Sequence, residues 1–110
     1  MFKISQNHAF THTVKVQTPI DDDEFRTDTF KARFKMLPSN EAEAFDLRSP
    51  EGTKDFVRAV VLSTEDILGE DNKPMPHTPE LLEQLISVYA VRIEFVNTYF
   101  AAVTKARLGN

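Results

Sequence analysis

The sequence predicts an α+β fold, in which an N-terminal antiparallel β-hairpin of two or three strands precedes a bundle of three to four helices. The first observation is that apolar residues recur at every second position before Pro38 and about every 3.6 positions after it. The second is that the chain has 110 residues, 41% hydrophobic and 27% charged, which suits one modest core. We therefore expect a single domain over 1–110, with a β part at 1–37 and a helical part at 38–110.

The predicted hairpin consists of two alternating segments, 10–17 and 26–36, joined by a polar loop. Thr18-Pro19 ends the first segment, because proline lacks the N–H that a β-ladder requires. Two such segments around a short loop pair most simply as antiparallel neighbours. A third strand at Phe2 and Ile4 would extend the sheet. The residues on the apolar face are Phe10, His12, Val14, Val16, Phe30, Ala32, Phe34 and Met36.

Capping signals predict where the helices begin. Ser49-Pro50-Glu51 combines a serine cap, a proline at the first helical position and an acid in the first turn, which predicts a helix over 50–62. Thr78-Pro79-Glu80 repeats this pattern and predicts a helix over 79–87. A short helical segment is expected to follow Pro38, where serine and asparagine offer a cap.

The last helix is predicted over 89–107, after a break at Ser87. Between the second and third helical segments lies a connector, 63–78, which contains a glycine, two prolines and two acidic pairs. We expect Ile67 and Leu68 to anchor this connector to the core.

Composition excludes several classes of function. The formal net charge is −4 and the sequence pI is about 5.3, so nucleic-acid binding is not expected. The absence of cysteine removes disulfides, thiol chemistry and thiolate zinc sites. No apolar run approaches the roughly 18 residues of a membrane span, and the N-terminus lacks a signal-peptide pattern. We therefore expect a soluble intracellular protein with no nucleic acid and no membrane among its partners.

No candidate catalytic, cofactor or metal site emerges from the motifs. The acidic segments 21–24 and 69–73 lack the alternating ligand spacing of calcium loops. His8, His12 and His77 have no paired ligand at helix spacing. A Gly-x-Ser-x-Gly elbow and a glycine-rich phosphate loop are both absent. These observations predict a protein that is not an enzyme and that needs no cofactor.

A basic row, Lys31, Arg33 and Lys35, lies on one face of the second predicted strand. An acidic partner could use this row. Charged rows on exposed strands more commonly prevent edge-to-edge aggregation, and we favour that interpretation.

The last predicted helix carries more apolar surface than one packing contact requires. On a helical wheel, one stripe is followed by a second stripe beside it, so that the apolar arc is about twice the roughly 100° that faces a single core. We expect the first stripe to face the core and the second to bind a partner or a second copy. Alternatively, the helix lies between the sheet and the 50–62 helix and both stripes are internal. The first stripe is Val88, Val91, Phe95, Tyr99, Ala102 and Ala106; the second, and hence the candidate partner-binding set, is Tyr89, Ile93, Val96 and Phe100.

The order of these segments resembles the small tail assembly chaperones of long-tailed (siphovirus-type) phages and prophages. The likeness covers 10–110 and lies in the order and spacing of its parts rather than in one diagnostic motif. In chain order, these parts are the Pro19 turn with its aspartate-rich loop, Thr29-Phe30-Lys31-Ala32-Arg33-Phe34, Val60-Val61-Leu62, Glu65-Asp66-Ile67, Glu70-Asp71-Asn72-Lys73-Pro74-Met75-Pro76, Thr78-Pro79-Glu80-Leu81-Leu82, Tyr99-Phe100 and Gly109-Asn110. The chain departs from the pattern in two places, since relatives often carry tryptophan near Thr64 and proline near Tyr89.

The resemblance implies a specific function. Such proteins accompany the helical tape-measure protein and keep its apolar surfaces from aggregating until tail-tube subunits polymerise around it. It implies the cytoplasm of the bacterial host as the location and absence from the mature virion. In many relatives a frameshifted longer form recruits the tail-tube protein, and the resemblance carries no catalytic residues.

Two alternatives from other classes remain open. One is a structural head–tail connector or tail terminator, which would persist in virions as a closed ring. The other is a small host-directed regulator or inhibitor that binds one host protein.

Overall fold

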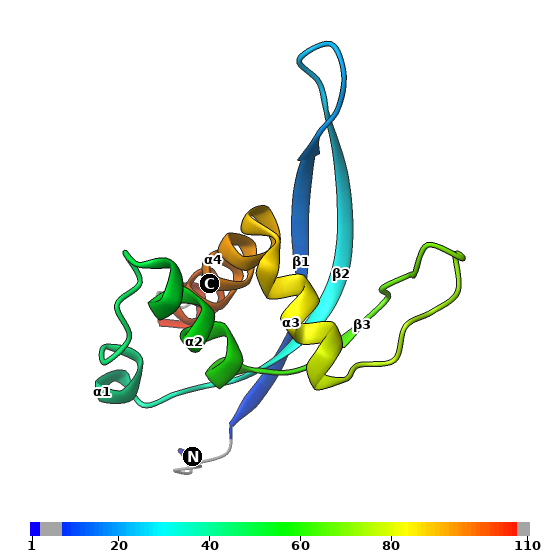
Figure 1. Ribbon diagram of the computed structural model, residues 1–110. Helices are drawn as coiled ribbons and strands as arrows, with labels where there is room; N and C mark the ends of the chain where they lie inside the picture. The colour runs from blue at the N-terminus through cyan, green and yellow to red at the C-terminus, as the bar shows by residue number, and fades with distance from the viewer. Residues whose placement is uncertain (3–7, 108–110) are drawn as a thin grey trace.

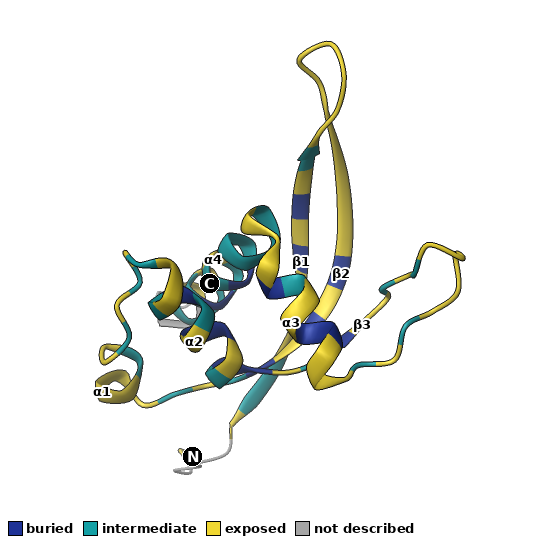
Figure 2. Cartoon of the chain, viewed as in Figure 1, coloured by how far each residue is buried: buried dark blue, intermediate teal, exposed yellow. Residues whose placement is uncertain are grey.

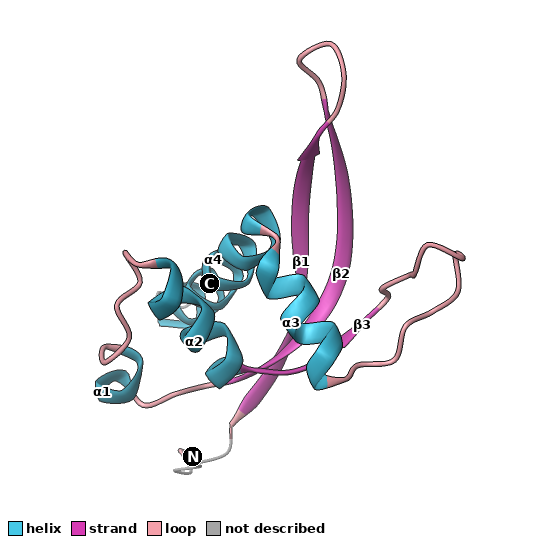
Figure 3. Ribbon diagram, viewed as in Figure 1, coloured by secondary structure: helices cyan, strands magenta, loops and turns pink. Residues whose placement is uncertain are grey.

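The computed structural model describes residues 1–2 and 8–107, with side chains up to residue 105. Its elements follow an α+β order, which confirms the predicted fold class (Figures 1 and 3). In chain order they are β1 (Ala9–Pro19), β2 (Phe25–Lys35), α1 (Ser39–Ala42), α2 (Pro50–Val60), β3 (Val61–Glu65), α3 (Pro79–Ser87) and α4 (Tyr89–Arg107).

The three strands form one antiparallel sheet in the order β1-β2-β3. The hairpin of β1 and β2 was predicted, and its register pairs Val14 with Phe30. From Val14 to Val16 and from Phe30 to Phe34 the even-numbered residues are buried and the odd-numbered ones are not, so the alternation in the sequence corresponds there to one covered and one open face. The residues buried on the covered face are Val14, Val16, Phe30, Ala32, Phe34, Val61 and Thr64.

The third strand of the described sheet is β3, which the sequence did not predict. Phe2 lies outside any strand and is exposed, and Ile4 falls outside the described residues. The helix expected over 50–62 ends instead at Val60, and the chain continues directly into β3. β3 pairs with the edge of β2, where Leu62 is the extra residue of a β-bulge and is exposed. The open edge of β2 and the β-branched valine at position 61 favour the strand over another helical turn.

The predicted starts of α2 and α3 are confirmed by their caps, whereas α1 begins after Pro38 without the expected serine or asparagine cap. The hydroxyl of Ser49 accepts a hydrogen bond from the Gly52 N–H at 2.9 Å, and that of Thr78 accepts one from the Leu81 N–H at 3.0 Å. Each caps an otherwise unpaired N–H of the first turn. The break at Ser87 is also confirmed, since α3 ends there and α4 begins two residues later.

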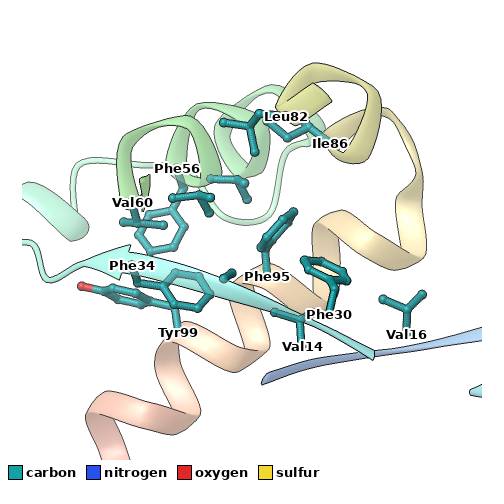
Figure 4. Packing of buried hydrophobic residues seen from close by; sticks show 13 residues of the cluster. Val14, Val16, Phe30, Phe34, Phe56, Val60, Leu82, Ile86, Phe95 and Tyr99 are labelled. Atoms are coloured by element: carbon teal, nitrogen blue, oxygen red, sulfur yellow. The ribbon is translucent and has the colours of Figure 1, made fainter. Parts of the chain in front are cut away.

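Aromatic side chains of α4 connect the sheet to the helices (Figure 4). Phe95 and Tyr99 are buried, and their rings contact Phe34 with centroids 6.4 and 6.1 Å apart. Tyr99 also lies edge-on to Phe56 of α2 at 5.2 Å. Its hydroxyl accepts a hydrogen bond from the Leu37 N–H at 3.1 Å, so one residue of α4 fastens the chain as it leaves β2.

An exposed ion pair joins α2 to α3. The guanidinium of Arg58 donates two hydrogen bonds to the Glu83 carboxylate, both at 2.8 Å. This bidentate contact lowers the pKa of Glu83.

In the connector after β3, Ile67 packs against the core as predicted, whereas Leu68 is 58% exposed and does not anchor it.

The molecule is elongated because the hairpin projects beyond the helices (Figure 1). Its extents are 49 × 29 × 29 Å and its radius of gyration is 15.0 Å, against about 13 Å for a compact chain of this length. The hairpin turns at Asp22 and Asp23, whose φ angles of 63° and 60° are the positive values that tight hairpin turns need. Aspartate tolerates this conformation better than most residues, and this preference explains why aspartates occupy the turn.

Candidate protein-binding surface beside the last helix

The middle of the first apolar stripe of α4 faces the core, as predicted, whereas Ala102 is half-buried and borders a surface hollow. Phe95 and Tyr99 are 0% and 2% exposed, and Val91 is half-buried against the same cluster. Val88 differs, because it lies before the helix as the C-cap of α3 and is 51% exposed. Ala106 lies beyond the side chains that the structure describes.

The second stripe is divided between the core and the surface. Val96 and Phe100 are half-buried and pack against the core cluster. The Phe100 ring stacks on that of Phe56 in α2, with centroids 5.4 Å apart and planes 10° apart. This end of α4 therefore lies between the sheet and α2, which is the internal arrangement that the sequence left open. The expectation that Phe100 belongs to an exposed face is met only in part, because its ring packs on Phe56 while the residue also borders a separate surface hollow of about 470 Å³ that it forms with residues 42–48.

The other two residues of the second stripe border a surface groove. Tyr89 is 61% exposed, and Ile93, one turn later, is half-buried. Both line a groove of about 660 Å³ whose opposite wall is β1, where Lys15 and Gln17 lie. Of the four predicted partner-binding residues, these two meet in one concave surface.

The groove continues along α4. A second hollow of about 340 Å³ shares Lys15 and Glu94 with the first, so the two form one path between helix and strand. We call this path the α4–β1 groove. Sequence reasoning missed the contribution of β1, because no local pattern indicates which strand a distant helix will flank. The remaining residues of the second hollow are His12, Thr13, Asn97, Thr98, Ala101, Ala102 and Lys105.

Arg92 supports the exposed ring of Tyr89. Its guanidinium carbon lies 5.4 Å from the centre of that ring, and its Nη1 donates a hydrogen bond to the Ile86 carbonyl at 3.1 Å. This carbonyl lies in the last turn of α3, where a cation is favourable. The Nε of Arg92 is buried and has no hydrogen-bond partner within the described part of the chain. Arg92 thus holds the start of α4 against the end of α3 and orients Tyr89 at the groove mouth.

The basic row lies on the open face of the sheet. Lys31 and Arg33 are exposed, and Arg33 donates a hydrogen bond to the Thr11 hydroxyl across the strands at 3.1 Å. None of the three residues of the row lines the α4–β1 groove.

The histidines and acidic loops do not assemble into a ligand set. His12 Nδ1 lies 2.8 Å from the Thr11 carbonyl oxygen, and His77 Nδ1 lies 2.8 Å from the Thr64 hydroxyl. Across residues 1–2 and 8–107, no three histidine or carboxylate side chains are placed to hold a metal ion together. Among the same residues, no helix combines the length and apolar character needed to cross a bilayer.

Comparison with protein-family models, with curated proteins and with solved structures finds no match to this chain. The α4–β1 groove is therefore assigned as the candidate site from its own geometry.

Proposed function

We propose that this protein is an assembly chaperone of a long-tailed phage or prophage, which binds the tape-measure protein and keeps it soluble until tail-tube subunits polymerise around it. The observation that carries the proposal is the α4–β1 groove, in which exposed Tyr89 and half-buried Ile93 lie beside the charged residues Lys15 and Glu94. The order of sequence segments that resembles such chaperones supports it further.

The groove suits an amphipathic helix as its ligand. Tyr89, Ala90 and Ile93 provide an apolar strip, and Lys15 and Glu94 lie beside it with opposite charges. An amphipathic helix docks by placing apolar side chains three and four residues apart into such a strip, with its polar side chains at the rim. A tyrosine with one apolar and one polar end is a common anchor at protein interfaces. In this mechanism, the chaperone covers the apolar stripe of one client segment without any chemical step.

The same proposal places the protein in the cytoplasm of the bacterial host and outside the finished virion. A frameshifted longer form would add contacts to the tail-tube protein, as in the family that the sequence resembles. A second copy of the chain bound in the same groove would compete with the tape-measure protein.

Co-expression with the tape-measure protein from the same genome tests the proposal. We expect wild-type chain to bring the tape-measure protein into the soluble fraction and to co-purify with it. Tyr89→Ser and Ile93→Ser should each weaken this co-purification by at least about tenfold, as expected for anchor residues of an interface. Because Tyr89 is 61% exposed, its substitution should leave the melting temperature nearly unchanged.

Leu68→Ser is the matched control, since Leu68 is 58% exposed on the connector and lies outside the groove. It should co-purify like wild type. Retention of the tape-measure protein by Tyr89→Ser would contradict the groove assignment. Failure of wild-type chain to bind it, together with recovery of the chain in purified virions or on one host protein, would overturn the proposed function.

A further inference from the structure

In the described residues, no hydrophobic side chain of the far half of the β-hairpin belongs to the core or packs against it (Figure 2). Between Val16, the last buried residue of β1, and Phe30, the first buried residue of β2, no residue is buried. We call this segment, residues 17–29, the distal arm. A two-stranded hairpin with neither face covered is at best marginally stable in water. A structure of this kind gains stability when a third strand or another surface covers it.

One edge of the distal arm is open for strand pairing. The hydrogen bonds from Met36 N–H to the His8 carbonyl and from Ile20 N–H to the Glu24 carbonyl, both at about 3 Å, show that even-numbered residues pair within the hairpin. In an antiparallel ladder, the main-chain groups of the odd-numbered residues then point away from the partner strand. β3 pairs with the outward-pointing main-chain groups of β2 from Lys31 onward, and Lys31 lies opposite Glu65, where β3 ends. In the described residues, no strand pairs with the outer edge of β2 from Phe25 to Thr29.

The opposite edge of the arm is less suited to pairing. Pro19 lies on the outer edge of β1 and has no N–H to donate. Gln17 borders the α4–β1 groove, so the start of α4 flanks this edge. The edge of β2, with Phe25, Thr27 and Thr29, contains no proline, and all three residues are exposed.

Charge indicates which kind of strand would bind. The distal arm holds five of the 17 acidic residues and one of the 13 basic ones, so its formal charge equals the net charge of the whole chain, −4. Arg26 is already paired with Asp28 at 2.7 Å. Ile20 and Phe25, 47% and 58% exposed, lie beside the acidic turn. A segment with alternating basic and apolar side chains complements both features.

We propose that the distal arm is a docking site for an extended, Lys- or Arg-rich segment of a partner protein, which adds a strand along Phe25–Thr29. The main-chain groups of β2 supply the hydrogen bonds, as in other cases of strand addition. The acidic turn, residues 21–24, attracts the basic side chains, and Phe25 contacts the apolar ones. This surface is distinct from the α4–β1 groove, and the proposal does not depend on the chaperone assignment.

A short fluorescein-labelled peptide that alternates lysine and valine is the probe. Anisotropy titration against the full chain should show saturable binding that weakens as salt rises from about 0.05 to about 0.3 M. Amide chemical shifts should move at Phe25–Thr29 rather than along α4. A peptide that alternates glutamate and valine has the same strand propensity with the opposite charge, and it should bind at least about tenfold more weakly.

Two cross-strand neighbours supply a matched pair of variants. Gln17 and Thr27 face each other in the hairpin, and each N–H points away from the other strand. Thr27→Pro should weaken binding of the lysine–valine peptide at least about tenfold, whereas Gln17→Pro should stay within about twofold of wild type. A third variant, Asp21→Asn, Asp22→Asn, Asp23→Asn and Glu24→Gln together, keeps residues that tolerate positive φ and removes the charge. This variant should also bind the lysine–valine peptide at least about tenfold more weakly than wild type. If Thr27→Pro does not fold, this variant tests the proposal in its place.

Four results would overturn the proposal. They are no binding at low salt, equal binding of the glutamate–valine peptide, unchanged binding to the charge-neutralised variant, and chemical-shift changes that map to α4. Loss of binding in Gln17→Pro with retention in Thr27→Pro would refute the assignment to the β2 edge.

Discussion

At the residue scale, the last helix shows what a helical wheel can and cannot predict. The wheel placed Phe95 and Tyr99 on one stripe, and both are buried. It placed Phe100 on the neighbouring stripe, where the ring meets Phe56. A wheel gives the direction of each side chain from one helix axis. It contains no information on which other element lies in that direction, so the assignment of core and surface needed the position of α2.

Phe100→Ser should destabilise the fold, because its ring stacks on Phe56 and lies edge-on to Tyr99 at 5.1 Å. We expect a loss of about 2–3 kcal/mol, below the value for a fully buried phenylalanine since the residue is only half-buried. Chemical denaturation measures it, with Tyr89→Ser, expected within about 0.5 kcal/mol of wild type, as the control. Equal denaturation midpoints for the two variants would show that the Phe100 ring does not stabilise the core.

At the element scale, the sequence identified helix beginnings far better than the third strand. Ser49-Pro50 and Thr78-Pro79 are local signals, and both caps form as the residues require. The passage from α2 to β3 has no such signal, because Val60 and Val61 continue one apolar run with no glycine or proline between them. The strand forms where β2 offers an unpaired edge. That edge is a tertiary feature, which explains why periodicity extended the helix to Leu62.

Gly52 allows the start of α2 to lie against the preceding turn. A Cβ at this position would come within 1.9 Å of the Asp46 carbonyl oxygen and 2.6 Å of its carbon, both backbone atoms. Gly52→Ala should therefore destabilise the protein by about 1–3 kcal/mol, although alanine is the better helix former by about 1 kcal/mol. Thermal melting with a van't Hoff analysis measures the change.

Gly69→Ala is its control. A Cβ there would meet only side-chain atoms, Asp71 Oδ1 at 3.1 Å and Met75 Sδ at 3.4 Å, which can move. We expect a change of no more than about 0.5 kcal/mol. If Gly52→Ala were equally mild, α2 would be able to shift away from the turn that precedes it.

At the scale of the whole molecule, the candidate surfaces depend on contacts between distant segments. The α4–β1 groove joins residues about 75 positions apart, such as Lys15 and Tyr89. The sequence indicated surplus apolar surface on the last helix but not the strand that forms the other wall. It also identified a polar loop between the two hairpin strands without indicating how far the hairpin projects. Both gaps arise because strand length and helix position are set by packing across the sheet rather than by neighbouring residues.

The projecting hairpin makes a prediction about what holds the molecule together. Deleting Thr18-Pro19 with Phe25-Arg26 removes two cross-strand pairs and preserves the alternation of the ladder. None of the four residues is buried, so we expect the free energy of unfolding to change by no more than about 0.5 kcal/mol. Phe30→Ala, in the covered half of the same hairpin, should cost about 3–5 kcal/mol by comparison. Urea denaturation of both variants measures how much each half of the hairpin contributes to the free energy of unfolding. A loss above about 2 kcal/mol in the shortened hairpin would mean that the arm contributes to folding, whereas an unchanged stability leaves binding as the reason for its length.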